Sequence, residues 1–434
     1  MVVSRDKTPT AQETFVQMAQ AAGLRGRLLL TIGLLVLVRM GIYIPLPGID
    51  RAAFAANIQG NTALSFVDLF AGGGLRTLGI FALGILPFIN ASIILQLLTA
   101  AIPALEDLQK NEGEAGRRKI SQITRYVAGG WAIVQSLMLT IGLLRPFASD
   151  WGPLFVTETV LALTAGSMFV MWVGELITER GIGNGASLLI FLNIVSTLPR
   201  SLGQTFELAQ SGDRNVVGGV VILLIVFLAM VVGIVFVQEG TRRIPIISAR
   251  RQVGRRTYLE KSSYLPLRLN QGGVMPIIFA STVLTLPALV AQAFQNASIS
   301  QFISTYLGPS SWQHSVLYLV LILFFSYFYA SLVVQPDEMS KNLKKMGASI
   351  PGIRPGKATT EYIERVLNRL TFLGAIFLGI VAIVPTFVET ATRVPTFQGF
   401  GATSLLILVG VAIDTAKQIQ TYVISQRYEG MVKQ

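Results

Sequence analysis

The chain has 434 residues, of which 52% are hydrophobic and only 13% are charged, and its mean hydropathy is +0.60. A water-soluble domain of this size could not keep such a balance in solution, so the composition predicts an integral membrane protein. The absence of Cys excludes disulfides, thiolate metal sites and Cys nucleophiles, and a single His leaves metal chemistry poorly supplied. The net charge is +12, and in a membrane protein the positions of the Lys and Arg residues are more informative than their sum.

Ten apolar runs, separated by polar loops with Gly and Pro, are each about long enough to cross a bilayer. They cover roughly residues 28–44, 77–102, 126–144, 154–174, 184–199, 216–237, 272–294, 315–334, 370–388 and 401–421. The predicted fold class is therefore an all-α membrane protein with ten transmembrane helices. The first run has a basic flank like that of a signal peptide, but no small-residue cleavage site follows it and nine further runs do.

Lys and Arg residues set the expected orientation of these spans. With the N-terminus in the cytoplasm, 28 of the 35 cations fall on the inner side. Eight of them lie in the loop at about 239–270 and seven in the loop at about 336–369. We therefore expect a multi-pass protein with both termini in the cytoplasm.

The second and seventh runs repeat one phrase. GILPFINASIIL at residues 84–95 returns as GVMPIIFASTVL at residues 273–284, which is 189 positions later (273 − 84), with six of twelve residues identical. If the ten spans are divided into two blocks of five, each copy lies in the second span of its block. Because five is an odd number, the second block crosses the membrane in the opposite direction to the first. The repeat predicts two inverted halves, residues 1–200 and 201–434, with a working site between them near the bilayer midplane.

Pro87 and Pro276 each follow a Gly by three residues, which suits the first turn of a helix, where a missing N–H does no harm. Before Pro87, the run of Gly at 72–74 breaks the apolar pattern. We therefore expect a helix that begins inside the membrane after a non-helical segment, which must line a cavity or be buried in protein. A kinked, lipid-facing helix is the alternative.

Aliphatic residues recur at helical spacing near both copies. Ile85 and Ile89, like Ala186 and Ile190, are four residues apart and so stack on one side of a helix. A ring of such side chains would form a constriction that dewets and resists ions, whereas ordinary core packing is the alternative explanation.

The two large cytoplasmic loops are rich in paired cations, and one contains the turn sequence PGIRPG at 351–356. Orientation alone does not require Arg doublets, so we interpret the loops as a docking surface for a large anionic partner such as ribosomal RNA. The docking candidates are Arg242, Arg243, Arg250, Arg251, Arg255, Arg256, Lys344, Lys345, Arg354 and Lys357.

Taken together, these segments resemble the SecY family, the channel subunit of the bacterial protein-translocation complex. The most specific matches span essentially the whole chain and are GILPFINASIILQLL, GEAGRRKISQITRY, GELITERGIGNGASLLIF, RRIPI with RRQVGRR, NQGGVMPIIFAS, NLKKMGASIPGIRPG and GATSLLIL. The resemblance implies a central hourglass pore that passes unfolded secretory chains across the bacterial cytoplasmic (inner) membrane and releases membrane segments sideways into it.

The resemblance also implies three groups of site residues. The pore ring would be Ile85, Ile89, Ala186, Ile190, Ile278 and Ile407. The plug, at about 61–75, would include Leu64, Phe66, Val67, Leu69, Phe70, Gly72, Gly73 and Gly74. The lateral gate, formed by the second, third, seventh and eighth spans, would include Pro87, Asn90, Ser92, Gln96, Pro276, Ser281 and Thr282. Ala186 is smaller than the aliphatic residue often found at its position, which weakens the expected seal on that side.

The implied partners are SecE-like and SecG-like small membrane subunits, a SecA-like motor ATPase, the ribosome with its RNA, signal sequences, unfolded polypeptides and the lipid bilayer. No catalytic residue, metal or cofactor is implied, because ATP hydrolysis belongs to the motor. The alternative is a small-solute secondary transporter with inverted repeats. Charged residues within the spans are scarce and lie near their ends, as Arg39, Glu175 and Asp414 do, which argues against an ion-coupled transporter. An intramembrane enzyme would need a catalytic constellation that the spans lack.

Overall fold

The structure is a computed structural model and is mainly helical. It describes residues 22–59, 68, 71–110, 113–210, 214–248, 252–253, 256–257, 262–294, 306, 311–392 and 402–432.

Each of the ten predicted apolar runs contains a helix. These helices are α2 (Ala22–Gly41), α6 (Leu86–Ala101), α8 (Gly113–Leu139), α9 (Pro153–Arg180), α10 (Gly185–Gln210), α11 (Arg214–Glu239), α12 (Met275–Phe294), α14 (Trp312–Val333), α16 (Lys357–Thr392) and α17 (Ala402–Val432). Five stretches of the described chain are long and apolar enough to cross a membrane: Gly113–Phe147, Pro153–Arg180, Val217–Glu239, Trp312–Lys345 and Lys357–Pro385. The length and composition of these helices are those of a multi-pass membrane protein.

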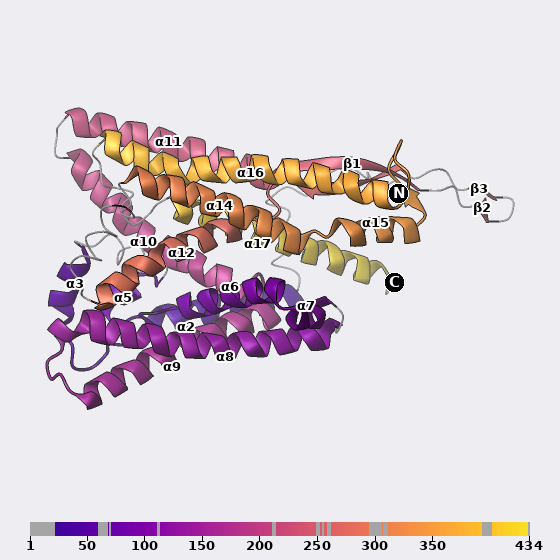
Figure 1. Cartoon of the computed structure of the whole chain (residues 1–434). Coiled ribbons are helices and arrows are strands. Elements are labelled where there is room, and N and C mark those ends of the chain that lie inside the picture. The colour runs from indigo at the N-terminus through magenta and orange to yellow at the C-terminus, as the bar shows by residue number, and fades with distance from the viewer. Residues whose placement is uncertain are drawn as a thin grey trace.

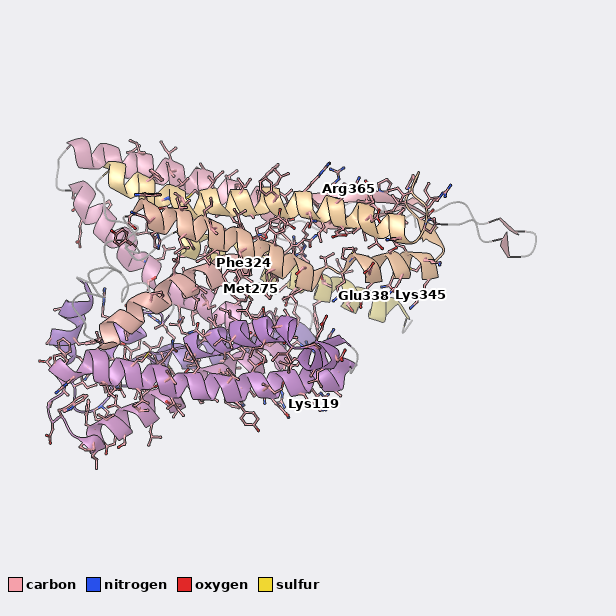
Figure 2. The ribbon with its side chains drawn as sticks, in the orientation of Figure 1. Lys119, Met275, Phe324, Glu338, Lys345 and Arg365 are labelled. Atoms are coloured by element: carbon pink, nitrogen blue, oxygen red, sulfur yellow. The ribbon has the colours of Figure 1, made fainter. Side chains whose placement is uncertain are left out.

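The shorter elements are α3 (Arg51–Gln59), α5 (Gly74–Thr77), α7 (Pro103–Lys110), α15 (Pro336–Lys345), the π-helix η1 (Thr140–Leu144) and the 3₁₀ turn η2 (Arg145–Phe147). In Figure 1, α7, α15 and the strands lie at one end of the molecule, and α3 lies at the other. Lys119, Lys345 and Arg365 lie toward the end with α7 and α15, whereas Met275 lies near the middle (Figure 2).

The long helices form two groups. In Figure 1, α2, α6, α8 and α9 form the lower group, and α11, α14 and α16 form the upper group. Helix α12 packs on α14 and also contacts α8 and η1 of the lower group, while α10 contacts both α9 and α11. The two groups therefore meet along α10 and α12.

The two copies of the repeated phrase have the same local structure. Gly84 and Gly273 both have a left-handed backbone, with φ of 52° and 58°. A helix begins two residues later in each copy, so that Pro87 and Pro276 occupy its second position. In the first copy, the Leu86 N–H donates to the Leu83 carbonyl at 3.3 Å and the Ile89 N–H donates to the Ile85 carbonyl at 3.1 Å. In the second copy, the Met275 N–H donates to the Gly272 carbonyl and the Ile278 N–H to the Val274 carbonyl, both at 3.3 Å. The offset of 189 residues is thus kept in the backbone as well as in the sequence.

Helix α6 is too short to span a bilayer by itself. Its 16 residues extend about 24 Å, whereas a hydrocarbon core is about 30 Å thick. The turns at 71–85 precede it, and they are largely buried with partners for their polar groups. The Ile80 N–H donates to the Ile44 carbonyl at 2.9 Å, and the Ser167 hydroxyl donates to the Gly84 carbonyl at 3.0 Å. Over the described residues 71–85, the segment before α6 is buried in protein and is non-helical apart from the short helix Gly74–Thr77, as predicted, and it is not a kinked lipid-facing helix.

The prediction of an all-α chain is wrong at the end that holds α15. The strands β1 (Thr241–Ser248), β4 (Ser262–Arg268) and β5 (Ala348–Ser349) form an antiparallel sheet in the order β4-β1-β5, and β2 (Gln252–Val253) pairs with β3 (Arg256–Thr257). In β1, Ile244 and Ile246 are buried in a cluster with residues of α15 and α16, whereas Arg243 and Pro245 are exposed. This alternation is typical of a strand with one buried face. The strand was not predicted because the charged residues around it suggested a loop.

Candidate functional site

The six side chains expected to form the pore ring lie together in the central hydrophobic cluster. Five of them are buried, with exposed fractions between 0% and 7%, namely Ile85, Ile89, Ile190, Ile278 and Ile407. Ala186 is half-buried and packs against the same cluster. The expected ring residues come from the start of α6, in the lower group, and from α10, α12 and α17. Of these, α10 and α12 are the helices along which the two groups meet. Its side chains offer no hydrogen-bonding group, and the cluster is therefore a suitable seal against ions.

Two glycines allow α9 and α10 to approach closely beside the ring. A Cβ on Gly174 would lie 3.4 Å from the Ile85 Cδ1 and 3.3 Å from the Leu189 Cδ1. A Cβ on Gly185 would overlap the Gly174 carbonyl, so neither helix could be so near with a larger residue there. The backbone of α9 therefore lies against Ile85 and next to Ala186, whose own side chain is the smallest in the ring.

The expected lateral-gate residues are distributed over α6 and α12. Pro87, Asn90, Pro276 and Ser281 are buried, whereas Ser92, Gln96 and Thr282 are half-buried. The Gln96 amide donates to the Ser92 hydroxyl at 3.4 Å, and the Ser281 hydroxyl donates to the Ile278 carbonyl at 2.9 Å. Because α12 also contacts α8 and η1, it lies along the junction between the two groups of helices.

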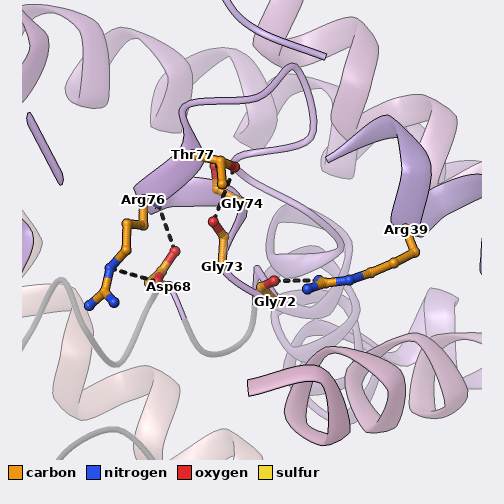
Figure 3. A network of polar contacts seen from close by, with 7 residues as sticks. All are labelled: Arg39, Asp68, Gly72, Gly73, Gly74, Arg76 and Thr77. Atoms are coloured by element: carbon orange, nitrogen blue, oxygen red, sulfur yellow. Dashed lines mark hydrogen bonds and ion pairs between the residues drawn. The ribbon is translucent and has the colours of Figure 1, made fainter. Parts of the chain in front are cut away.

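The plug residues are only partly accounted for. Leu64, Phe66, Val67, Leu69 and Phe70 lie outside the described residues. Gly72 and Gly73 have φ of 65° and 85°, and Gly74 begins α5. The Gly72 carbonyl accepts a hydrogen bond from the guanidinium of Arg39 (Figure 3).

Arg39 and Asn193 lie at the same site, although the sequence did not single them out together. Arg39 lies inside the first predicted span. This position could have indicated a contact with another segment, because an intramembrane cation needs a partner. Asn193 follows Ile190 by three residues and so lies on the same face of α10. Its amide lies so close to Gly72 that a Cβ on Gly72 would be only 2.7 Å from the Asn193 Cγ.

The three charged residues that the sequence places near span ends, Arg39, Glu175 and Asp414, each have a partner. Glu175 accepts a hydrogen bond from the Arg125 Nε at 2.7 Å. Asp414 lies 4.0 Å from the Arg268 Nη1, and Arg39 bonds the Gly72 carbonyl. Each of these groups is thus accounted for by a local contact, and no group of three or more metal-ligating side chains gathers within the described part of the chain.

The docking candidates that can be placed gather at the end with the sheet. Six are exposed: Arg242, Arg243, Lys344, Lys345, Arg354 and Lys357. Arg256 is in β3, while Arg250, Arg251 and Arg255 lie outside the described residues. The guanidinium of Arg243 stacks over the Tyr264 ring at 4.9 Å. The structure thus brings cations from both large loops to one end of the molecule.

Arg354 is presented on a turn that is fixed on both sides. The buried Ser340 hydroxyl of α15 donates to the Gly356 carbonyl at 2.9 Å. The Thr359 hydroxyl of α16 donates to the Arg354 carbonyl at 3.0 Å. Gly352 and Gly356 have φ of 77° and 114°, which L side chains rarely adopt. The guanidinium therefore projects from a rigid loop, which lowers the entropy lost on binding a partner.

The family model and the relatives that match this chain all belong to one family. A model of the SecY family matches residues 79–416. The protein translocase subunit SecY of Synechocystis sp. is 72% identical over 441 residues, which cover 100% of both chains. That of Porphyra purpurea is 57% identical and covers 96% of this chain and 100% of its own. The chloroplastic preprotein translocase subunit SECY of Spinacia oleracea is 46% identical, covering 94% of this chain and 74% of its own.

Solved structures share the fold. One, described as the structure of a protein conducting channel, superposes with a TM-score of 0.65 at 19% identity, covering 91% of each chain. Another, Sec61 in the canine ribosome-channel complex from the endoplasmic reticulum, has a TM-score of 0.62 at 18% identity and also covers 91% of each chain. On its sequence and its fold, the chain belongs to the SecY family.

Proposed function

We propose that the chain is a protein-conducting channel, which passes unfolded secretory chains across the bacterial cytoplasmic membrane and releases membrane segments sideways into the lipid. The observation that carries the proposal is the central apolar cluster, to which both copies of the repeat contribute an aligned Ile, Ile89 and Ile278. A site built from both halves at their junction is where an inverted repeat places its working site. The function named for the close relatives agrees with it.

The proposed topology has ten spans in two inverted halves, residues 1–200 and 201–434, around an hourglass pore. The matching backbone at Gly84 and Gly273 supports the repeat. The gathering of cations at the end with α7 and α15 supports a cytoplasmic location for that end and for both termini.

The proposed mechanism follows from the chemistry of the ring. Aliphatic side chains close the resting pore because water does not wet a narrow constriction without polar groups. They also lack partners for the polar backbone of a passing chain, so they do not retain it. The plug, with Gly72–Gly74 at its end, blocks the pore, and a hydrophobic segment leaves sideways where α12 meets the helices of the other half.

The proposed partners divide between the membrane and the cytoplasm. SecE-like and SecG-like subunits would lie in the membrane, and a SecA-like motor or the ribosome with its RNA would dock on the exposed cations around Arg354. We propose no catalytic role for the chain itself, because the motor supplies the energy of ATP hydrolysis. The relative bound to a canine ribosome has the same fold, which supports a ribosome-sized partner.

Transport by purified complex in vesicles tests this function. With the motor ATPase and ATP, we expect an unfolded preprotein to become protected from external protease, with no accumulation of small solutes. Solute accumulation without preprotein transport would instead favour the secondary transporter.

Reversing the charge of Arg354 tests the docking surface in the same assay. We expect Arg354→Glu to slow motor-driven transport about tenfold or more, because a rigidly presented cation becomes repulsive to an anionic partner. Co-purification of the small subunits should remain normal. Arg51→Glu makes the same charge change on α3, at the opposite end, and should have little effect. Normal transport by Arg354→Glu would refute the docking role.

A further inference from the structure

Arg39 is a cation inside the bundle that is paired with a main-chain carbonyl. It lies in the last turn of α2, is half-buried, and its guanidinium is 5.9 Å from the ring of Tyr43. Its Nη1 donates to the carbonyl of Gly72 in the glycine segment, Gly72–Gly74 (Figure 3). A charge at membrane depth is costly without a partner, so this contact stabilises both Arg39 and the position of the glycine segment.

Gly72 also lies directly against the wall of the proposed pore. A Cβ at this position would lie 2.7 Å from the Asn193 Cγ and 3.0 Å from the Arg39 Nη1. Asn193 is buried and is one helical turn beyond Ile190 of the ring. Gly72 is therefore held between α2 and the pore-facing side of α10, next to the ring.

The rest of the turn has contacts of its own. The Gly73 N–H donates to the Asp68 carbonyl at 2.9 Å, and the Asp68 carboxylate accepts from the Arg76 N–H at 2.8 Å. The Thr77 hydroxyl donates to the Gly73 carbonyl at 3.1 Å (Figure 3). These bonds give the turn its shape. The Thr77 hydroxyl, 3.2 Å from the Ile42 carbonyl, and the Ile80 N–H, bonded to the Ile44 carbonyl, anchor its far end to the segment after α2. Gly72 is the contact of the turn with Arg39 and Asn193.

We propose that Arg39 and Asn193 form a latch that holds the glycine segment against the pore wall in the closed channel. Arg39 supplies the bond, and Asn193 supplies the surface against which Gly72 packs so closely that a Cβ would displace the amide. Both are positioning residues rather than a binding site for the transported chain. The latch rests on the proposed function, because holding a plug matters only if the chain is a channel.

Resting ion conductance of the purified complex in a planar bilayer, without preprotein, measures the latch. We expect Arg39→Met to raise the conductance about tenfold or more through the loss of a charge-assisted hydrogen bond. Arg39→Lys keeps one donor and should restore part of the seal. Arg145→Met is the control, because Arg145 also stacks on an aromatic ring, that of Trp151 at 5.7 Å, but is placed elsewhere.

A second pair of variants separates the contact from backbone strain. Gly72 and Gly73 both have positive φ, but a Cβ on Gly73 would meet nothing within 4 Å. We therefore expect Gly72→Ala to leak several-fold more than Gly73→Ala. Equal leakage would assign the effect to strain alone and overturn the latch, and this comparison holds even if Arg39→Met does not fold.

The transport assay distinguishes the two levels of the proposal. If the unaltered complex moves preprotein but Arg39→Met seals as well as Arg145→Met does, the latch is wrong and the channel stands. If the unaltered complex moves no preprotein with the motor and ATP, the proposed function itself fails.

Discussion

Covalent linkage of α6 to α12 is expected to stop preprotein transport. Ile89 and Ile278 belong to the same buried cluster. In the proposed channel the polypeptide passes between α6 and α12, so these helices must separate during transport. The chain has no Cys, so cysteines introduced by Ser92→Cys and Thr282→Cys would be the only reactive thiols. Both positions are half-buried and therefore reachable by a bismaleimide. Transport before and after linkage, measured by protease protection, gives the result.

Two controls make the linkage experiment specific to the gate. A longer and more flexible spacer between the same cysteines should restore transport. The hydroxyls of Ser136 and Thr164 lie 3.2 Å apart on α8 and α9, within one group of helices, so linking cysteines placed there should leave transport intact. Full transport by the fully linked Ser92 and Thr282 pair would contradict a gate between α6 and α12.

Polar substitution of the ring is expected to open a leak in the resting channel. Ile89→Asn, Ile278→Asn and Ile407→Asn each place an amide in a site where the native side chain is at most 7% exposed. The amide binds water, and a wetted constriction conducts ions, so the resting conductance should rise about tenfold or more. Single-channel recording without preprotein measures it.

Ile363→Asn is the matched control for the ring. Ile363 is 0% exposed, but it lies in the separate cluster between the sheet and α16. The change should cost stability by about 2–5 kcal/mol, as large losses in a core do, without raising the resting conductance. An unchanged conductance in all three ring variants, or an equal leak from Ile363→Asn, would show that the ring is not the seal.

The features that the sequence predicted well are local ones. Runs of apolar residues predicted the ten helices, because crossing a bilayer demands length and hydrophobicity within one segment. The Gly and Pro residues of the repeat predicted where α6 and α12 begin, because both act on the backbone at their own positions. The strand β1 was missed although Ile244 and Ile246 alternate with exposed residues, since its charged surroundings suggested a loop.

Contacts between distant segments could not be predicted in the same way. Arg39 and Gly72 are separated by 33 residues, and nothing in either segment specifies the other. The bond from Ser340 to Gly356 similarly depends on how α15 folds back on the loop that carries Arg354. Family resemblance placed the ring residues, but only the packing of α9 against α10 shows why Gly174 lies beside them.

Site-specific crosslinking of a polypeptide stalled during transport shows whether the chain passes through the ring. A benzophenone amino acid is placed in turn at the positions of Ile89, Ile278, Ile407 and, as the control, Ile363, and a preprotein with a folded C-terminal domain is stalled in the complex and irradiated. We expect adducts between preprotein and channel from the three ring positions and none from position 363. A stalled, protease-protected preprotein that gives no adduct at any ring position would contradict it.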